Sequence, residues 1–494
     1  MTAAMPKEVT DAAQFSLGKY LKDASVFGLA QQLLKLSSLV TLPLITKKLG
    51  VDQYGLLTLT NALSGFLVWF VLWSFPSATV RLLVGEKDPY RMAQVHHTAL
   101  IFIAGSGLVW YAIAWPFMEP LSVYFFGHAH YAILVHLSIL STIVTAAVNL
   151  LMAVYRIREE NVRYTRIDVV FNLLATALTV AILLIVDNVV PVVVALVLFK
   201  TLRSFWLLIQ FVRMYGWARP SIDLFRPYLK FCMPLLIPQI MAWSMNLSDR
   251  FFLSHYFDAE TVGIYTANYN LPILLNHLVL ALFFSFTPAF ARLWNAGDHT
   301  TLRRDFARTA NIMLAIGLPM AVGMSLLCTP LMTLLTTPEV GQASWQVVPF
   351  VAFAYLFVGL GGYGSEVFMY LKKTGTTGWF ATGAALLNLL GNALLIPQYG
   401  VLGASISTAM AFALQSLITT YMAQRLFAFH FDGPFIFKIV ISTAGMGIIL
   451  FVLPSDQTWH ALVKIPVGGI LYILFLYILQ GCPSGNQIRA LLRS

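Results

Sequence analysis

The 494-residue chain contains 59% hydrophobic and 11% charged residues and has a formal net charge of +10. A soluble domain carries about 25% charged residues, so this composition excludes a soluble protein and predicts a polytopic membrane protein. Because the basic residues lie in short loops between apolar runs, a nucleic-acid-binding role is disfavoured. The first 22 residues are polar and mixed, so no cleavable signal peptide is expected.

Fourteen apolar runs are predicted to cross the membrane as helices. At 1.5 Å per residue, each is long enough for a hydrocarbon core of about 30 Å. The predicted spans lie near 24–46, 53–80, 95–118, 131–154, 167–186, 189–212, 229–256, 261–290, 309–335, 345–370, 379–397, 399–423, 436–454 and 462–480. The chain is therefore expected to be an all-α polytopic membrane protein.

The distribution of basic residues predicts the orientation of these helices. Twenty-four of the 31 Lys and Arg residues fall in the N-terminal arm, the C-terminal tail or the loops on one side, whereas Lys47, Lys48 and Lys464 fall on the other. The positive-inside rule then places both termini in the cytoplasm and the protein in the inner membrane. Arg81 and Arg292 end their helices on the cytoplasmic side, where we interpret them as topology anchors more readily than as substrate ligands.

Several segments recur at a nearly constant offset. SFPSATVRL (74–82) returns as SFTPAFARL (285–293), and the turn VDQYGLLT (51–58) returns within FDAETVGIYT (257–266). Weak matches taken together and in order indicate an internal repeat. Six spans per copy is an even number, so the two copies should be related by a pseudo-two-fold axis along the membrane normal, with a substrate site between them near the midplane.

This repeat predicts the organisation of the whole chain. The expected parts are a cytoplasmic arm at 1–23, two six-helix bundles at 24–213 and 229–423, a linker at 214–228, an appended helix pair within 424–480 and a cytoplasmic tail at 481–494.

The residues that carry the repeat also carry a resemblance to a known family. TLPLITKKLGVDQYGLLTL (41–59), SFPSATVRL and NLSDRFFLSHYFDAETVGIYTANYNL (246–271) resemble the Wzx-type oligosaccharide flippases. That family belongs to the superfamily of the multidrug extruders and the peptidoglycan-precursor flippase. The resemblance implies two six-helix bundles around a central cavity. It also implies movement of undecaprenyl-diphosphate-linked repeat units from the cytoplasmic to the periplasmic leaflet for surface polysaccharide assembly.

Four cations lie within the predicted spans, and each is a candidate for function because an intramembrane charge is costly unless it faces protein or water. They are Lys35, Lys200, Arg203 and Arg250. Gln31 and Asn246 lie one helical turn from Lys35 and Arg250 and would share their faces. Cations suit a diphosphate, since Arg offers a planar fork and Lys a mobile charge. The alternatives remain open: a snorkelling or paired Lys35, structural roles for Lys200 and Arg203, and an interhelix pair involving Asp249 and Arg250.

Three carboxylates are candidates for coupling transport to a proton or sodium gradient: Asp168, Asp249 and Glu366. A buried carboxylate can bind and release protons. For Glu366, pairing with the nearby Lys372 or Lys373 is the favoured reading. Adjacent helical residues point about 100° apart, so Asp249 and Arg250 are not expected to be simply each other's partner.

The sequence offers little support for catalysis. The three cysteines (Cys232, Cys328 and Cys482) have neither disulfide nor metal-ligand spacing, and the histidines lack a metal-binding spacing on one helix. We therefore expect a transporter that needs no cofactor or metal. Its expected partners are the lipid-linked oligosaccharide, the bilayer and, for polysaccharide assembly, a polymerase and a chain-length regulator. The alternatives are a cation-coupled multidrug extruder of the same superfamily and, less favoured, a membrane glycosyltransferase or polymerase.

Overall fold

The structure is a computed structural model, and it describes residues 41–83, 85–221, 223, 225–453 and 460–479. All regular structure within these residues is helical. Eleven helical segments are long and apolar enough to cross a membrane. The predicted all-α polytopic fold is thus confirmed, while the number of fourteen spans stays a prediction.

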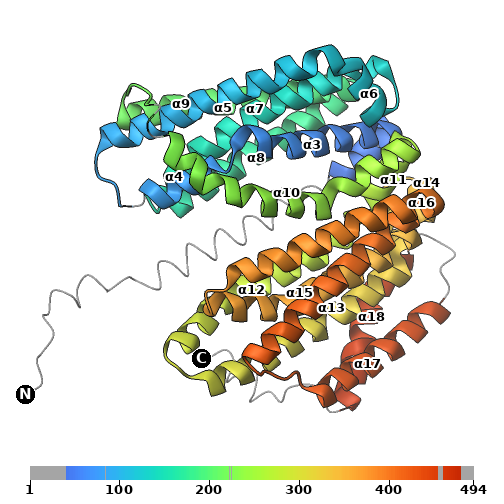
Figure 1. The fold of residues 1–494 in the computed structure, drawn as a ribbon. Helices are drawn as coiled ribbons and strands as arrows, with labels where there is room; N and C mark the ends of the chain where they lie inside the picture. Colours follow the sequence, from blue (N-terminus) through green and yellow to red (C-terminus); the bar gives the residue numbers. More distant parts are fainter. Residues whose placement is uncertain (1–40, 84, 222, 224, 454–459, 480–494) are drawn as a thin grey trace, which may run out of the picture.

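The N-terminal helices form the upper layer of Figure 1. Residues 41–49 are helical, and the elements after them are α3 (Val51–Leu72), α4 (Phe75–Leu83), α5 (Pro89–Ala114), α6 (Met118–Phe126), α7 (Ala132–Ile157), α8 (Asn161–Leu183) and α9 (Val189–Tyr215). Helix α7 lies at the centre, because α3, α4, α5 and α9 all pack against it. Helix α8 packs against α9 and α7.

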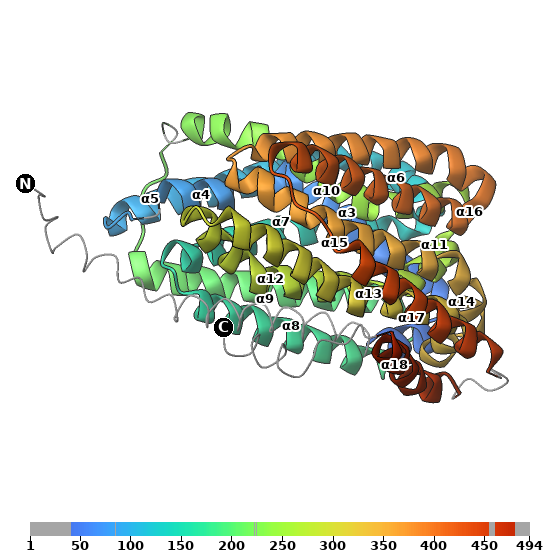
Figure 2. The same ribbon diagram turned by 90° about the horizontal axis from the view of Figure 1, so that it is seen from below.

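The C-terminal helices form the lower layer, with α10 and α11 lying between the two layers in Figure 1. They are α10 (Phe225–Tyr256), α11 (Ala259–Tyr269), α12 (Ile273–Asn295), α13 (His299–Leu335), α14 (Pro338–Ala343), α15 (Val348–Tyr370), α16 (Thr374–Leu426), α17 (Gly433–Val452) and α18 (His460–Ile478). Helix α15 packs on α12, α13 and α16, and the pair α17–α18 packs on α13, as the view from below also shows (Figure 2).

Short polar residues at the expected places start several of these helices. Asp88 precedes Pro89 and accepts a hydrogen bond from the backbone N–H of Tyr90. Asp258 and Asp298 accept from the backbone N–H three residues later at the starts of α11 and α13. These side chains satisfy amide groups that have no partner inside the helix.

Helix α16 is a hairpin of two helical arms. Gly400 has a non-helical backbone (φ 53°, ψ −128°), a conformation that glycine adopts readily. On either side of it the arms run antiparallel, since the Ser407 hydroxyl donates to the Asn388 carbonyl at 2.9 Å. A Cβ on Gly391 would lie 2.4 Å from the Ser407 Oγ, so this glycine lets the arms approach closely. The chain thus reverses at PQYG (397–400), where the sequence predicts a turn between two spans.

The two repeat copies touch through equivalent glycines. A Cβ on Gly55 in α3 would lie 1.7 Å from the carbonyl oxygen of Ala259, and a Cβ on Gly263 in α11 would lie 2.0 Å from that of Val51. Gly55 and Gly263 are 208 residues apart, and so are Val51 and Ala259. This is the offset of the repeat between 51–58 and 257–266. A reciprocal contact of this kind is what a two-fold relation produces. Small residues let the backbones of α3 and α11 meet directly.

The second spans of the two copies are interrupted at different places. In the first copy, Trp73 and Ser74 adopt left-handed backbone conformations (φ 50° and 58°) between α3 and α4. In the second copy the interruption comes earlier, at 270–272 between α11 and α12, and α12 runs through Pro288 without a break. The two copies of the motif therefore differ in structure: SFPSATVRL begins at a helix break, whereas SFTPAFARL lies within α12.

Candidate functional site

A cavity of about 330 Å³ lies between the two repeat copies. Its walls come from residues 41–45, from α3, from the second half of α10 and from α11. Arg250 is the charged residue among those that line it. Polar groups from both sides surround it, including Tyr54, whose hydroxyl accepts a hydrogen bond from the Asn270 side chain at 3.0 Å. As far as the described residues show, the cavity therefore combines one buried cation with neutral hydrogen-bonding groups at the junction of the copies.

Arg250 and Asp249 form a buried ion pair with each other. The Nη1 of Arg250 lies 2.6 Å from the Asp249 Oδ1, and both side chains are buried. The same nitrogen donates to the Asn246 backbone carbonyl at 2.7 Å. The expectation that these neighbours would not be simply each other's partner is wrong. A helical wheel gives only the direction of each Cβ, and the long arginine side chain folds back to its neighbour.

Two tyrosines of α11 complete this cluster, and the sequence analysis did not single them out. The Tyr265 hydroxyl donates to the second carboxylate oxygen of Asp249 at 2.5 Å. The Arg250 guanidinium stacks over the rings of Tyr265 and Tyr269, at 5.0 and 4.7 Å from their centroids. The i, i+4 spacing of the two tyrosines in GIYTANY was the signal, since it places both rings on one helical face.

Other predicted cavity residues have different surroundings. The Asn246 side chain is exposed and donates to the Ala242 carbonyl at 2.7 Å, so it meets Arg250 only through its backbone. Lys200 donates to the Ser141 hydroxyl at 2.9 Å, between α9 and α7. Gln31 and Lys35 lie outside the described residues.

Arg203 and Asp168 form an ion pair inside the N-terminal layer. The Arg203 Nη2 lies 3.0 Å from the Asp168 Oδ1, which joins α9 to α8, and the side chains are 12% and 20% exposed. The Asn172 amide also donates to this carboxylate at 3.0 Å. Neither Lys200 nor Arg203 is among the residues that line the cavity at Arg250. Among the described residues of the predicted set, Asp249, Arg250 and the Asn246 backbone meet beside this cavity, whereas Arg203 and Asp168 meet away from it.

Glu366 is buried near the end of α15, where two hydroxyl groups hold it. Thr287 of α12 donates to one carboxylate oxygen at 2.6 Å, and Tyr370 donates to the other at 2.5 Å. Among the ion pairs of the described residues, none joins Glu366 to Lys372 or Lys373. The favoured prediction for Glu366 is therefore wrong. The carboxylate is directed toward α12 and not past the helix end.

The two residues interpreted as anchors occupy matching positions. Arg81 lies in the last turn of α4, and Arg292 lies in the last turn of α12. Both side chains are exposed. A cation in the last turn also interacts favourably with the carbonyl end of its helix.

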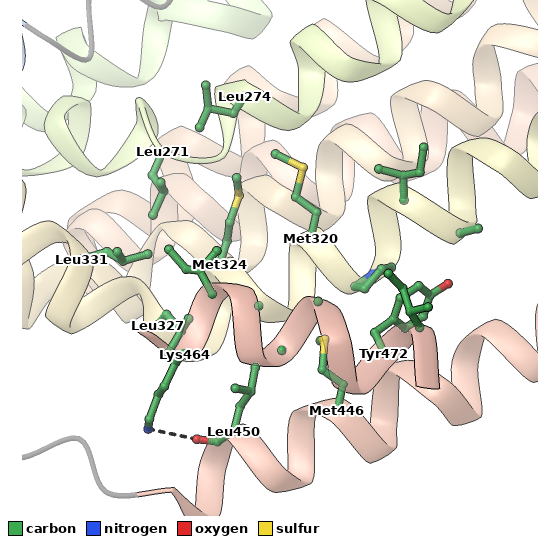
Figure 3. A pocket seen from close by; sticks show the side chains of 18 residues that line it. Leu271, Leu274, Met320, Met324, Leu327, Leu331, Met446, Leu450, Lys464 and Tyr472 are labelled. Atoms are coloured by element: carbon green, nitrogen blue, oxygen red, sulfur yellow. Dashed lines mark hydrogen bonds between the residues drawn. The ribbon is translucent and has the colours of Figure 1, made fainter. Parts of the chain in front are cut away.

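A second cavity, of about 590 Å³, lies in the C-terminal layer between α13, α17 and α18 (Figure 3). Its lining is apolar apart from a few groups, with Met320 and Met324 on one side and Met446 and Leu450 on the other. Lys464 lies at its edge, where its Nζ donates to the carbonyls of Leu450 at 3.1 Å and of Leu453 at 2.6 Å. The lysine thereby satisfies carbonyls at the end of α17.

No cluster of three or more metal-ligating side chains occurs in the part of the chain that the structure describes. His96 and His97 lie near the start of α5 and are buried. His97 stacks on Trp217 and contacts the backbone of Ala218, in the segment that joins the two repeat copies.

Comparison with solved structures shows the fold. The lipid II flippase MurJ, in an inward closed conformation, matches over 92% of this chain and 98% of its own length, with a TM-score of 0.77 and 16% identity. A multidrug resistance MATE family transporter of the MOP superfamily, in an inward-facing conformation, matches over 80% of this chain and 98% of its own, with a TM-score of 0.61 and 14% identity. These similar structures are transporters and flippases.

Sequence comparison shows the family. An uncharacterized membrane protein of Methanocaldococcus jannaschii is 21% identical over 223 residues, which are 45% of this chain and 42% of the relative. The family model described as polysaccharide biosynthesis protein matches residues 29–341, more than half of the chain. The matched range includes the segments at 41–59 and 246–271 that carry the resemblance seen in the sequence. The chain belongs to the polysaccharide biosynthesis protein family.

Proposed function

We propose that this protein is a flippase that carries a polyprenyl-diphosphate-linked oligosaccharide from the cytoplasmic to the outer leaflet by alternating access. Undecaprenyl diphosphate is the carrier that the family resemblance implies. A diphosphate would face a prohibitive barrier in bare hydrocarbon, as any isolated charge does. A polar cavity that opens to each side in turn would remove most of that barrier while the lipid tail stays in the bilayer.

The observation that carries this proposal is the placement of Arg250 in the wall of the cavity between the repeat copies. One guanidinium nitrogen is engaged by Asp249 and by a backbone carbonyl, while the buried Nε has no partner among the described residues. Arginine carries five N–H donors in a fixed fork. Asp249 neutralises the charge of Arg250, and the remaining N–H donors of the guanidinium suit phosphate oxygens. An arriving diphosphate would compete with Asp249 for the cation.

The apolar cavity between α13, α17 and α18 suits part of the lipid chain. Its volume of about 590 Å³ and its methionine and leucine lining favour a hydrocarbon over a sugar, since a polar group buried there would lose its hydrogen bonds. Gly469 lines this cavity, and a Cβ added there would meet nothing within 4 Å. Gly469→Leu should therefore fill the cavity and lower transport. Gly105→Leu on α5, where a Cβ also meets nothing within 4 Å, is the matched control.

Coupling to a proton or sodium gradient forms part of this proposal. Asp249 is the favoured coupling carboxylate because it touches the cavity cation, whereas Asp168 and Glu366 are held elsewhere. In a polysaccharide pathway, a polymerase and a chain-length regulator would act on the product at the outer face.

Deletion of the gene tests the function directly. The lipid-linked oligosaccharide should accumulate on the cytoplasmic side, measured by accessibility of the sugar to an enzyme or lectin added to inside-out and right-side-out vesicles. Restoring the wild-type gene should remove the accumulation. If the intermediate is distributed normally and the deleted strain instead becomes sensitive to cationic drugs, the protein is an extruder and the proposal is wrong.

A further inference from the structure

The break between α3 and α4 has an uncommon backbone conformation. Trp73 and Ser74 are consecutive non-glycine residues with positive φ, a conformation that costs about 1–3 kcal/mol per residue and that persists where the surrounding structure enforces it. Trp73 donates through its indole N–H to Ser106 at 3.2 Å, and Ser106 donates to the carbonyl of Phe70 at 3.2 Å. Neighbouring side chains thus hold the break in place.

This break opens a polar cavity of about 210 Å³. Its ten lining residues come from α3, α4, α7, α8 and α10, and seven of them carry a side-chain hydrogen-bonding group. The first residues of the SFPSATVRL motif form one wall, with Ser74 and Ser77 among them. Gln239 of α10 forms another and donates to the Ser74 hydroxyl at 2.9 Å. Both repeat copies therefore contribute to the cavity.

Among the described residues that line this cavity, the hydrogen-bonding groups are neutral with one exception. The indole N–H of Trp69 is buried and has no partner among the described residues, although a buried indole N–H usually finds one. Asn149 is exposed toward the cavity and can both donate and accept. Arg156 is the exception, and its guanidinium lies over the Tyr164 ring at 4.9 Å and donates to the Tyr164 hydroxyl at 3.3 Å.

We infer that this cavity is a carbohydrate-binding subsite that holds one sugar unit of the transported oligosaccharide, an inference that rests on the proposed function. Sugar hydroxyls both donate and accept, as the amides of Asn149 and Gln239 do. Trp69 offers an aromatic surface together with an unused donor. The volume is below the roughly 300–1,000 Å³ of pockets for drug-sized ligands, which suits a single monosaccharide.

A phosphate is a poorer fit to the same cavity. Phosphate recognition calls for several converging cations or backbone amides, and this cavity has one guanidinium, which Tyr164 already engages. The diphosphate is therefore assigned to Arg250 and the sugar to the break between α3 and α4. Because Gln239 belongs to the second copy and Trp69 to the first, a bound sugar would contact both copies at once.

Sugar binding to the purified full-length protein in nanodiscs tests this assignment without any transport step. Saturation-transfer NMR would use glucose, galactose, mannose, rhamnose and N-acetylglucosamine as probes. At least one sugar should receive saturation from the wild-type protein. Trp69→Phe keeps an aromatic ring and removes the N–H donor, so it should weaken that binding about tenfold, the effect of losing one hydrogen bond to a buried donor. Asn149→Ala should weaken it to a similar degree.

Trp379→Phe is the matched control, because Trp379 is 75% exposed on α16 and lies outside the cavity. Unchanged thermal midpoints would show that the variants are folded. The assignment is overturned if none of the five sugars receives saturation, if both cavity variants bind like the control, or if pyrophosphate displaces the sugar. If the lipid-linked oligosaccharide accumulates in the deleted strain but the purified protein binds no sugar, only the assignment of the sugar subsite is contradicted. If the protein binds a sugar but no intermediate accumulates, the proposed flippase function is contradicted.

Discussion

In the described part of the chain, two arginine–carboxylate pairs join residues inside helices, and they differ in what surrounds them. Arg250 and Asp249 are consecutive residues of α10, 2.6 Å apart, buried and enclosed by tyrosines of α11. Arg203 and Asp168 join α9 to α8 at 3.0 Å and remain partly exposed. Arg250 of the first pair lines the cavity between the repeat copies, whereas the second pair holds two neighbouring helices of one copy together. An intramembrane charge is thus a guide to function only when its position relative to the cavity is known.

The two pairs also differ in which helices their members belong to. Both members of the first pair belong to α10, and the Arg250 guanidinium is buried against Tyr265 and Tyr269 of α11, with its Nε unpartnered among the described residues. The members of the second pair belong to α8 and α9, so breaking it would leave two charges on separate helices. We therefore expect the two pairs to respond in opposite ways to substitution.

The largest effect is expected for Arg250→Ala. Removing the guanidinium leaves the Asp249 carboxylate buried without its cation, which costs about 3–5 kcal/mol, and it also removes the proposed phosphate ligand. Both the thermal midpoint in detergent and complementation of the deleted strain should fall. Arg250→Lys should recover part of the stability and less of the transport, since lysine lacks the planar fork.

Asp249→Asn combined with Arg250→Gln separates these two causes. The double variant removes both charges and keeps similar volumes, so its stability should approach that of the wild type. Complementation should remain lost if Arg250 binds the substrate. If the double variant restores both transport and stability, the pair has a structural role and Arg250 does not bind the substrate.

The fold could be predicted from the sequence further than the site could. Apolar runs predict the helices, and the chain reversal at Gly400 follows from PQYG. The repeat shows that Gly55 and Gly263 are equivalent, but equivalence does not reveal that each lies against the other's helix. Contacts between distant segments depend on packing that periodicity does not encode.

The site was predicted only in part, for the same reason. Arg250 stands out because a charge in an apolar run is costly. Tyr265 and Tyr269 do not stand out in the sequence, since aromatic residues are common in this chain. Arg203 and Asp168 lie 35 residues apart, so their pairing depends on how α8 and α9 pack. The pairing therefore becomes visible only in three dimensions.

Gly55→Ala tests the contact that brings the two copies together beside the first pair. The added Cβ would lie 1.7 Å from the Ala259 carbonyl oxygen, so α3 and α11 must separate. We expect a loss of about 1–3 kcal/mol in stability, the usual cost of overpacking, and reduced transport. Gly105→Ala is the control, because a Cβ there meets nothing within 4 Å. Equal thermal midpoints for the two variants would contradict the close contact.

The smallest effect on transport is expected for Asp168→Asn combined with Arg203→Gln. Both side chains can still hydrogen-bond across α8 and α9, and neither pair member lines the cavity at Arg250. Because the charges are partly exposed, neutralising both should change stability by no more than about 1 kcal/mol. Complementation at normal expression should match the wild type. Loss of transport in a stable double variant would show that Arg203 meets the substrate, as its position within a predicted span suggests. In that case the distinction between a cavity pair and a structural pair would have to be abandoned.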